Sequence, residues 1–165
     1  MVTAYLALGS NLGDRAATLR EGREALDATP GIRVTASSPL YQTEPLGGPV
    51  GQGPYLNAAI EVETPLSSHA LLRRCLEVEA RFGRRRHRRW EARTLDVDLL
   101  LFGAEIRDDP ELVLPHPRLH LRRFVLVPLR DLAPELLHPV LGRTVAELLA
   151  DLPPTGGVHS FSETW

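Results

Sequence analysis

Apolar positions along the chain follow two spacings. Four segments are loose alternations or short apolar runs bounded by Gly, Pro or polar residues, which predicts strands over residues 2–8, 32–43, 55–64 and 93–102. Two stretches between them place apolar residues at every third or fourth position, which predicts one helix after each of the first and third strands. The predicted order is therefore β-α-β-β-α-β.

Polar residues mark the ends of the two helices. Asp14 is a candidate N-cap for the first helix, which residues 29–31 (Thr-Pro-Gly) end. Ser67 or Ser68 is expected to cap the second helix, and Gly83 to end it. The single cysteine, Cys75, lies on the apolar stripe of this second helix and is expected in the core.

This order is typical of an α+β ferredoxin-like βαββαβ sandwich with an antiparallel sheet. Two additional C-terminal helices are expected, around residues 121–131 and 144–151, and the tail from residue 153 is expected to be irregular. The length of 165 residues, without a visible linker, predicts one domain over 1–165.

The last predicted strand carries two acidic residues. Asp96 and Asp98 are two positions apart, so their carboxylates share one face of the strand. Leu95, Val97, Leu99 and Leu101 are expected on the opposite face. Two adjacent like charges favour a cation, and Mg²⁺ commonly binds one or two carboxylates together with substrate phosphates.

A solvated strand face is the alternative interpretation of this pair. Leu100 and Phe102, which are expected to follow the aspartates on the same face, make that face apolar further along. Acidic residues at the start of a largely buried strand are costly unless they serve a purpose, which favours a functional site.

Composition narrows the possible classes of function. All 19 basic residues are arginine, so a phosphate-binding loop of the Walker type and a Schiff-base lysine are both excluded. The net charge of −2 indicates no general attraction to nucleic acid or membranes. With no long apolar run, no signal-peptide pattern and one cysteine, the protein is expected in the cytoplasm.

An arginine-rich run from Arg84 to Arg93 precedes the acidic strand and contains His87 and Trp90. Arginine binds phosphate oxygens with a planar pair of donors, so this run beside the carboxylates indicates nucleotide phosphoryl chemistry. A single-stranded RNA-binding module is the alternative class, because basic residues with an aromatic can bind a strand. Acidic residues on the neighbouring strand would repel such a ligand.

Three further segments are candidates for ligand contacts. Tyr55 and Asn57 share one strand face, where an aromatic ring and an amide suit a flat heterocycle. His116 lies between two prolines that restrict its backbone, and it is a candidate nucleotide or metal-shell contact. The Gly- and Pro-rich stretch 44–54 before Tyr55 could close over a site or be a plain connection.

Glu79 interrupts the apolar stripe of the second helix. Its carboxylate either reaches solvent from a boundary position or borders a polar site, and the spacing leaves both interpretations open.

Together these segments resemble the 6-hydroxymethyl-7,8-dihydropterin pyrophosphokinase (2-amino-4-hydroxy-6-hydroxymethyldihydropteridine diphosphokinase) family of the folate pathway. The matching stretches run in family order: ALGSNLGD (7–14), SPLYQTEPLG (38–47), YLNAA (55–59), RTLDVD (93–98), PHPR (115–118) and RRF (122–124). The resemblance implies transfer of pyrophosphate from ATP to the hydroxymethyl group of the pterin, with release of AMP.

The resemblance also implies roles for single residues. Asp96 and Asp98 resemble the ligands of two Mg²⁺ ions, and Arg84 and Arg93 resemble mobile arginines that neutralise developing charge. The remaining implied contacts are, for the pterin, Thr43, Leu46, Tyr55, Asn57 and Phe124, and, for ATP, Glu79, Trp90, Leu99, His116 and Arg122. A monomer that binds neither nucleic acid nor membrane is expected.

The chain departs from the family pattern at a few positions. Glu91 and Ala92 stand where the family usually has Gly and Pro, which affects the flexibility of the arginine-rich loop. Leu121 replaces an acid found in many members, and Leu76 a polar residue found in some. Neither aspartate is affected. A different flat heterocyclic alcohol as acceptor is the alternative within the same enzyme class.

Overall fold

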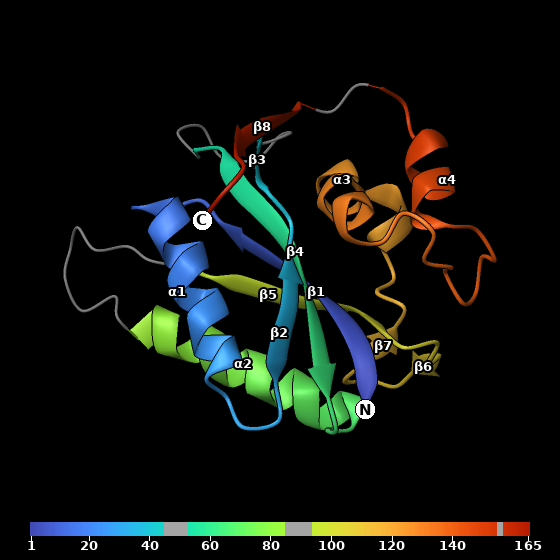
Figure 1. Ribbon diagram of the computed structural model, residues 1–165, viewed down its shortest axis with the longest axis horizontal. Coiled ribbons are helices and arrows are strands. Elements are labelled where there is room, and N and C mark those ends of the chain that lie inside the picture. The colour runs from blue at the N-terminus through green and yellow to red at the C-terminus, as the bar shows by residue number, and fades with distance from the viewer. Residues whose placement is uncertain (45–52, 85–93, 155–156) are drawn as a thin grey trace.

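A β-sheet with helices on both faces forms the framework of the computed structural model (Figure 1). The structure describes residues 1–44, 53–84, 94–154 and 157–165, with Arg84 described by its backbone alone. The elements are β1 (Val2–Ser10), α1 (Arg15–Asp27), β2 (Arg33–Ser37), β3 (Leu40–Thr43), β4 (Tyr55–Thr64), α2 (Ser68–Arg84), β5 (Asp96–Phe102), β6 (Arg107–Asp108), β7 (Val113–Leu114), the 3₁₀ turn η1 (Leu119–Leu121), α3 (Arg123–Leu132), α4 (Val145–Ala150) and β8 (Val158–Ser162).

The main sheet has the strand order β5-β1-β4-β3-β8, and β2 pairs with β4 beside β3. Each pairing among these described strands is antiparallel. The ferredoxin-like β-α-β-β-α-β order is confirmed, because β5 and the β2–β3 segment flank the central β1–β4 pair. β6 and β7 form a separate two-stranded hairpin after β5.

Two cores lie on the two faces of this sheet. Helices α1 and α2 cover one face, and their buried residues, such as Leu19 and Leu71, pack with alternate residues of β1, β4 and β5. Helices α3 and α4 cover the other face through residues such as Leu126 and Leu148. Cys75 is fully buried, as expected.

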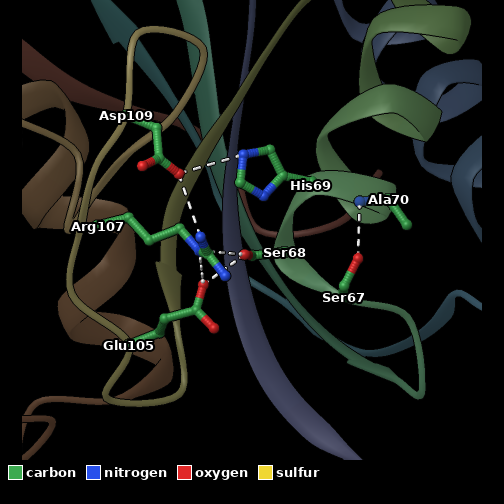
Figure 2. Close-up of polar contacts among 7 residues, drawn as sticks. All are labelled: Ser67, Ser68, His69, Ala70, Glu105, Arg107 and Asp109. Carbon is green, nitrogen blue, oxygen red and sulfur yellow. Dashed lines mark hydrogen bonds and ion pairs between the residues drawn. The ribbon is translucent and has the colours of Figure 1, made fainter.

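The ends of α1 and α2 were mostly predicted. The Asp14 side chain accepts a hydrogen bond from Ala17 N at 3.1 Å, so it is the N-cap of α1. Ser67 accepts from Ala70 N at 3.2 Å at the start of α2 (Figure 2). Gly83 does not end the second helix as predicted, because α2 continues through Arg84.

The predicted strand 32–43 is two strands, β2 and β3, separated at Ser38 and Pro39. Proline has no N–H to give to a sheet ladder, and the Ser38 hydroxyl accepts from Ala59 N at 2.9 Å in place of a backbone partner. The prediction of one continuous strand was therefore wrong, although both parts pair with β4.

The tail beyond residue 153 is not irregular, since β8 adds an edge strand beside β3. Ser160 pairs with Tyr41, and Trp165 then packs against the α1-side core. The Trp165 ring lies 3.9 Å from the Arg23 guanidinium, and its Nε1 donates to Ser38 O at 2.6 Å. Backbone pairing of a polar segment leaves no hydrophobic pattern, so the pattern of apolar positions did not predict this strand.

A bulge in β5 corrects the predicted faces of that strand. Leu6 pairs with Leu99 and Tyr5 pairs with Leu101, so Leu100 is an extra residue. As a result Leu101 packs on the α3 side and Phe102 on the α1 side, the reverse of the prediction. Leu76, one of the departures from the family pattern, lies away from the buried face of α2, with half of its surface exposed.

A polar cluster joins the start of α2 to the β6–β7 hairpin (Figure 2). Arg107 lies at its centre: Nε donates to Glu105 Oε2 at 2.8 Å and to Ser68 Oγ at 3.1 Å. A terminal guanidinium nitrogen binds Asp109, which also contacts His69 Nε2 at 3.3 Å. The cluster holds the hairpin that leads to His116 against α2.

No helix in the described part of the chain is both long and apolar enough to span a bilayer.

Candidate active site

Two carboxylates project from β5 toward the side of the sheet that α3 covers. Asp96 and Asp98 are exposed, whereas Val97 between them is buried with the α1-side core. The predicted alternation is confirmed at these positions, which precede the bulge. The two carboxylates therefore lie side by side at the start of an edge strand.

A row of paired residues connects this edge to the centre of the sheet. Asp96 pairs with Gly9 of β1, Gly9 with Asn57 of β4, and Asn57 with Tyr41 of β3. Directly paired residues of antiparallel strands point to the same face, so the carboxylate, the amide and the phenol lie along one line. Segments far apart in the sequence thus contribute to one surface.

Gly9 leaves room in the middle of this row. A Cβ atom at this position would lie 3.2 Å from Asn57 Nδ2 and 3.7 Å from a Tyr55 ring carbon. The absence of a side chain therefore lets the Asn57 amide and the Tyr55 ring approach the backbone of β1. An aromatic ring and an amide held side by side suit a flat heterocycle.

Hydrogen bonding fixes the Asn57 side chain. Thr43 Oγ1 donates to Asn57 Oδ1 at 2.8 Å, from the neighbouring strand β3. Tyr55 lies two residues before Asn57 on the same face, and burial raises the pKa of its phenol. The Asp96 carboxylate, which lies on the same face of the sheet, raises that pKa further.

His116 lies at the open edge of β5, near Asp98. Its backbone N–H donates to Leu100 O at 2.9 Å, which holds the 114–116 segment against β5. Burial lowers the pKa of the His116 imidazole, and the Asp98 carboxylate opposes that shift. His116 Nδ1 accepts from Arg118 N at 3.2 Å, so Nε2 is the ring nitrogen left for a ligand.

Arg122 and Phe124 continue the site toward α3. The Arg122 guanidinium carbon lies 5.5 Å from the centre of the Phe124 ring, and the charge of Arg122 lowers the pKa of His116. Phe124 is half-buried on the α3-side core, the same side of the sheet as Asp96 and Asp98. A cation at the N-cap of α3 and an aromatic ring in its first turn thus lie on the side of the sheet to which the two aspartates point.

Glu79 approaches β5 from the α2 side, where its carboxylate Oε2 accepts from Val97 N at 2.8 Å. Burial raises the pKa of Glu79, whereas the hydrogen bond from Val97 lowers it. Asp96 and Asp98 both raise that pKa. Of the two interpretations of Glu79, the structure favours the one in which α2 borders a polar site.

Several predicted site residues are not brought together by the described structure. Leu46, Trp90 and Arg93 lie outside the described residues, as does the side chain of Arg84. The Leu99 side chain is buried on the α1-side core, on the face opposite to Asp98, so the side-chain contact with ATP that the resemblance implies is not available.

Sequence reasoning missed Gly9 and Tyr41 as members of the site. The Tyr41 phenol donates a hydrogen bond to the Asp131 carboxylate of α3, and burial followed by this bond raises the pKa of Tyr41 to about 12. Both residues belong to the stretches matching the pterin pyrophosphokinase pattern, and that pattern was the signal that could have found them. Their place in the row depends on strand register, which the pattern does not show.

The donor set of this surface suits a hard divalent cation. Within the described residues, no cluster of three or more His, Cys, Asp or Glu side chains is arranged to hold a metal. Asp96 and Asp98 supply two exposed, adjacent carboxylates, which is the number that Mg²⁺ takes from a protein when phosphates complete its coordination. The residues present therefore fit Mg²⁺ bound together with a phosphate ligand.

Comparison with known proteins gives consistent matches. The family model described as 7,8-dihydro-6-hydroxymethylpterin-pyrophosphokinase (HPPK) matches residues 5–134. A relative from Methylorubrum extorquens named 2-amino-4-hydroxy-6-hydroxymethyldihydropteridine pyrophosphokinase is 50% identical over 94% of this chain and 97% of its own length. Relatives of the same name from Pseudomonas aeruginosa and Haemophilus influenzae are 43% and 42% identical, over 90% and 84% of this chain and 91% and 86% of their own lengths.

Solved structures support the fold. A chain described as HPPK-DHPS in complex with substrates matches with a TM-score of 0.70 at 13% identity, over 90% of this chain. The Plasmodium falciparum HPPK-DHPS with pterin and p-hydroxybenzoate matches with a TM-score of 0.65 at 16% identity. This chain spans 43% and 42% of the lengths of those two chains.

Proposed function

The chain belongs to the 7,8-dihydro-6-hydroxymethylpterin-pyrophosphokinase family, and we propose that it transfers pyrophosphate from ATP to 6-hydroxymethyl-7,8-dihydropterin on the α3-side surface around Asp96 and Asp98. In this reaction the hydroxymethyl oxygen of the pterin attacks the β-phosphorus of ATP. The bond from the β-phosphorus to the oxygen bridging it to the α-phosphorus breaks, AMP leaves, and the hydroxyl proton is lost. The product is the pterin pyrophosphate used in folate biosynthesis.

One observation supports placing the proposed reaction at this surface. Asp96 and Asn57 lie in one cross-strand row with only Gly9 between them. The carboxylate proposed to hold metal and phosphate therefore lies two strands from the amide proposed to bind the heterocycle, and this arrangement supports the proposal. Transfer between two bound substrates depends on holding the reacting groups close together in a fixed orientation, which such a row provides.

The pterin site is proposed around Asn57. The amide, held by Thr43, would bind polar edges of the ring, and Tyr55 and Phe124 would contact its faces. Leu46 is included on the resemblance alone. Gly9 lets the Asn57 amide and the Tyr55 ring lie close to the backbone of β1, where both would line the pterin site.

The ATP site is proposed along the edge of β5. His116 and Arg122 would contact phosphate or ribose oxygens, and Glu79 and the Leu99 backbone border the same edge. Arg84, Trp90 and Arg93 are assigned from the resemblance. Phosphoryl transfer needs positioning and charge neutralisation more than covalent catalysis, and a site of cations with paired carboxylates supplies both.

Asp96 and Asp98 are proposed to hold Mg²⁺, with two ions as the proposed number. When bound, the metal would neutralise charge on the triphosphate and orient it. The protein's own contribution is to present two carboxylates on a rigid strand whose opposite face is buried. We also propose that residues 1–165 act as one domain and as a monomer, and the cytoplasmic location stays a prediction.

AMP release tests the proposed function. Wild-type protein with ATP and Mg²⁺ should release AMP only when 6-hydroxymethyl-7,8-dihydropterin is present. Asp96→Ala should abolish this release, whereas Asp108→Ala, which removes an exposed aspartate of the β6 hairpin, should not. Pterin-independent AMP release, or an active Asp96→Ala variant, would contradict the assignment. A different flat heterocyclic alcohol that supports faster release would change the acceptor and keep the enzyme class.

A further inference from the structure

We propose that Glu79 is a positioning residue that fixes the backbone of β5 between the two aspartates, by accepting a hydrogen bond from Val97 N–H. This inference rests on the proposed function, because it assigns the two aspartates to the reaction. It gives Glu79 a role in the protein without a bound nucleotide.

The need for such a residue follows from the place of β5 in the sheet. Among the described strands, β5 is at the edge, with β1 as its neighbour in the strand order. Backbone N–H groups on the outer side of an edge strand have no strand to bind and usually face water. Val97 N–H is on this outer side, and a carboxylate oxygen of Glu79 accepts from it at 2.8 Å. A side chain of α2 thus takes the place of a missing strand.

The bonded N–H belongs to the peptide unit that joins Asp96 to Val97. Rotation of this unit would turn the Asp96 side chain relative to that of Asp98, because both aspartates flank the same residue. Val97 is only 4% exposed, and its side chain is packed in the α1-side core, which restrains this part of β5. The hydrogen bond that Val97 N–H donates to Glu79 restrains the same residue at its backbone, so the peptide unit is held both by its side chain and by its N–H.

Glu79 itself is mounted on a rigid part of α2. Cys75, Val78 and Phe82 surround it in sequence, and all three are nearly fully buried in the same core. A boundary carboxylate that merely reached solvent would not be held against the backbone of another element. The cost of burying the Glu79 carboxylate is offset by the charge-assisted hydrogen bond that it accepts from a backbone N–H.

Amide exchange in the metal-free and nucleotide-free protein gives a direct test. Hydrogen–deuterium exchange of the Val97 amide, followed by NMR, should be about fivefold to tenfold faster in Glu79→Ala than in wild type, as expected for loss of one such bond. Glu79→Asp, which withdraws the acceptor by one methylene, should show the same increase. Glu79→Gln keeps an acceptor at the same reach and should retain the protection.

Glu77→Ala is the matched control, because Glu77 lies on the same helix and binds Arg74 at 3.2 Å rather than β5. It should change neither Val97 exchange nor the Mg²⁺ requirement. Exchange of the Leu8 amide in β1 reports whether a variant has lost its global fold. If Glu79→Ala does not fold, the difference in Val97 exchange between Glu79→Asp and Glu79→Gln tests the proposal instead.

A second readout concerns the carboxylate pair. The Mg²⁺ concentration that gives half-maximal pterin-dependent AMP release should rise about tenfold in Glu79→Ala, the size seen when a residue behind a metal ligand is lost. In Glu79→Gln this Mg²⁺ concentration should lie closer to the wild-type value.

Unchanged Val97 exchange in Glu79→Ala, or a Gln variant as impaired as the Ala variant, would overturn the proposal. A raised KM for ATP alone would overturn it as well and assign Glu79 to nucleotide contact. Inactive wild-type protein would refute the proposed function, while Val97 exchange would still report on Glu79.

Discussion

Thr43 Oγ1 donates a 2.8 Å hydrogen bond to Asn57 Oδ1, and this bond decides which way the amide of Asn57 faces. With the oxygen occupied by Thr43, the Nδ2 group is directed over Gly9, where a Cβ atom would lie only 3.2 Å away. An amide without this restraint could flip and exchange its donor and acceptor positions. If the proposed pterin site is correct, recognition of a pterin edge by Asn57 should therefore depend on a threonine that lies on a different strand.

Thr43→Val should weaken pterin binding by removing this restraint while keeping the shape of the side chain. Loss of one hydrogen bond is worth about 0.5–1.5 kcal/mol, so KM for the pterin should rise about twofold to tenfold with KM for ATP unchanged. Thr35→Val is a matched control, since its hydroxyl donates to Glu61 on the far part of the sheet. An equal rise of both KM values in Thr43→Val would contradict the role assigned to it.

Gly22 and Gly83 both lie in helices, and alanine should have opposite effects at the two positions. A Cβ at Gly22 would lie 2.6 Å from a methyl carbon of Leu95, which is buried and has little room to move. Overpacking of this kind costs about 1–3 kcal/mol, more than the gain of about 1 kcal/mol in helix propensity. Gly22→Ala should therefore lower the free energy of unfolding.

A Cβ at Gly83 meets no described atom within 4 Å, so Gly83→Ala should leave stability unchanged or raise it by up to about 1 kcal/mol. Urea unfolding of both variants measures the contrast. If Gly22→Ala proves as stable as Gly83→Ala, the packing of Leu95 against α1 does not restrict the size of the side chain at position 22.

His138 makes the stability of the 134–144 segment depend on pH. Its Nδ1 accepts from Leu141 N at 3.0 Å and Val140 N at 3.3 Å, which requires an unprotonated nitrogen. Burial lowers the pKa of His138, and neighbouring His120 lowers it further. The unfolded chain therefore binds this proton more readily, and its contribution to stability should be lost as the pH falls below about 6.5 toward the lower folded-state pKa.

Urea unfolding at a pH of about 7.5 and of about 5.5, on either side of the ordinary histidine pKa, measures this dependence. His138→Asn should show a smaller loss between the two pH values, because an amide oxygen can accept the same bonds without titrating. His159→Asn, at an exposed position of β8, should retain the wild-type loss. An unchanged pH dependence in His138→Asn would exclude His138 as its source.

Trp165 should contribute to both stability and the pterin site. It stacks with Arg23, donates to Ser38 O and follows β8, which pairs with Thr43 through Val158. Trp165→Ala should lower the free energy of unfolding by about 2–4 kcal/mol, from lost aromatic packing and one hydrogen bond. KM for the pterin should rise as well, since β8 is the outer neighbour of β3.

Phe161→Ala provides the comparison, because this aromatic residue of β8 is 47% exposed. It should cost less than about 1 kcal/mol. If the two substitutions lowered the free energy of unfolding equally, the specific contacts of Trp165 with Arg23 and Ser38 would not be the source of its effect.

The local features of the site follow from short-range rules. A spacing of two residues is enough to place Asp96 and Asp98 on one face of a strand, and the same holds for Tyr55 and Asn57. The cap at Asp14 and the extent of β4 could be predicted for the same reason, because each depends on residues a few positions apart. The absence of lysine likewise excludes two kinds of chemistry on composition alone.

The order of elements, the acidic pair and the family pattern were therefore predictable from the amino-acid sequence, because periodicity and motifs are properties of neighbouring residues. Which segments meet was not. Strand register placed Gly9 between Asp96 and Asn57, and the Leu100 bulge exchanged the faces of Leu101 and Phe102. Folding of the whole chain also paired β8 with β3 and brought Glu79 to Val97 N–H. These contacts join backbone groups and side chains far apart in the chain, and their energies depend on packing between elements that no local pattern encodes.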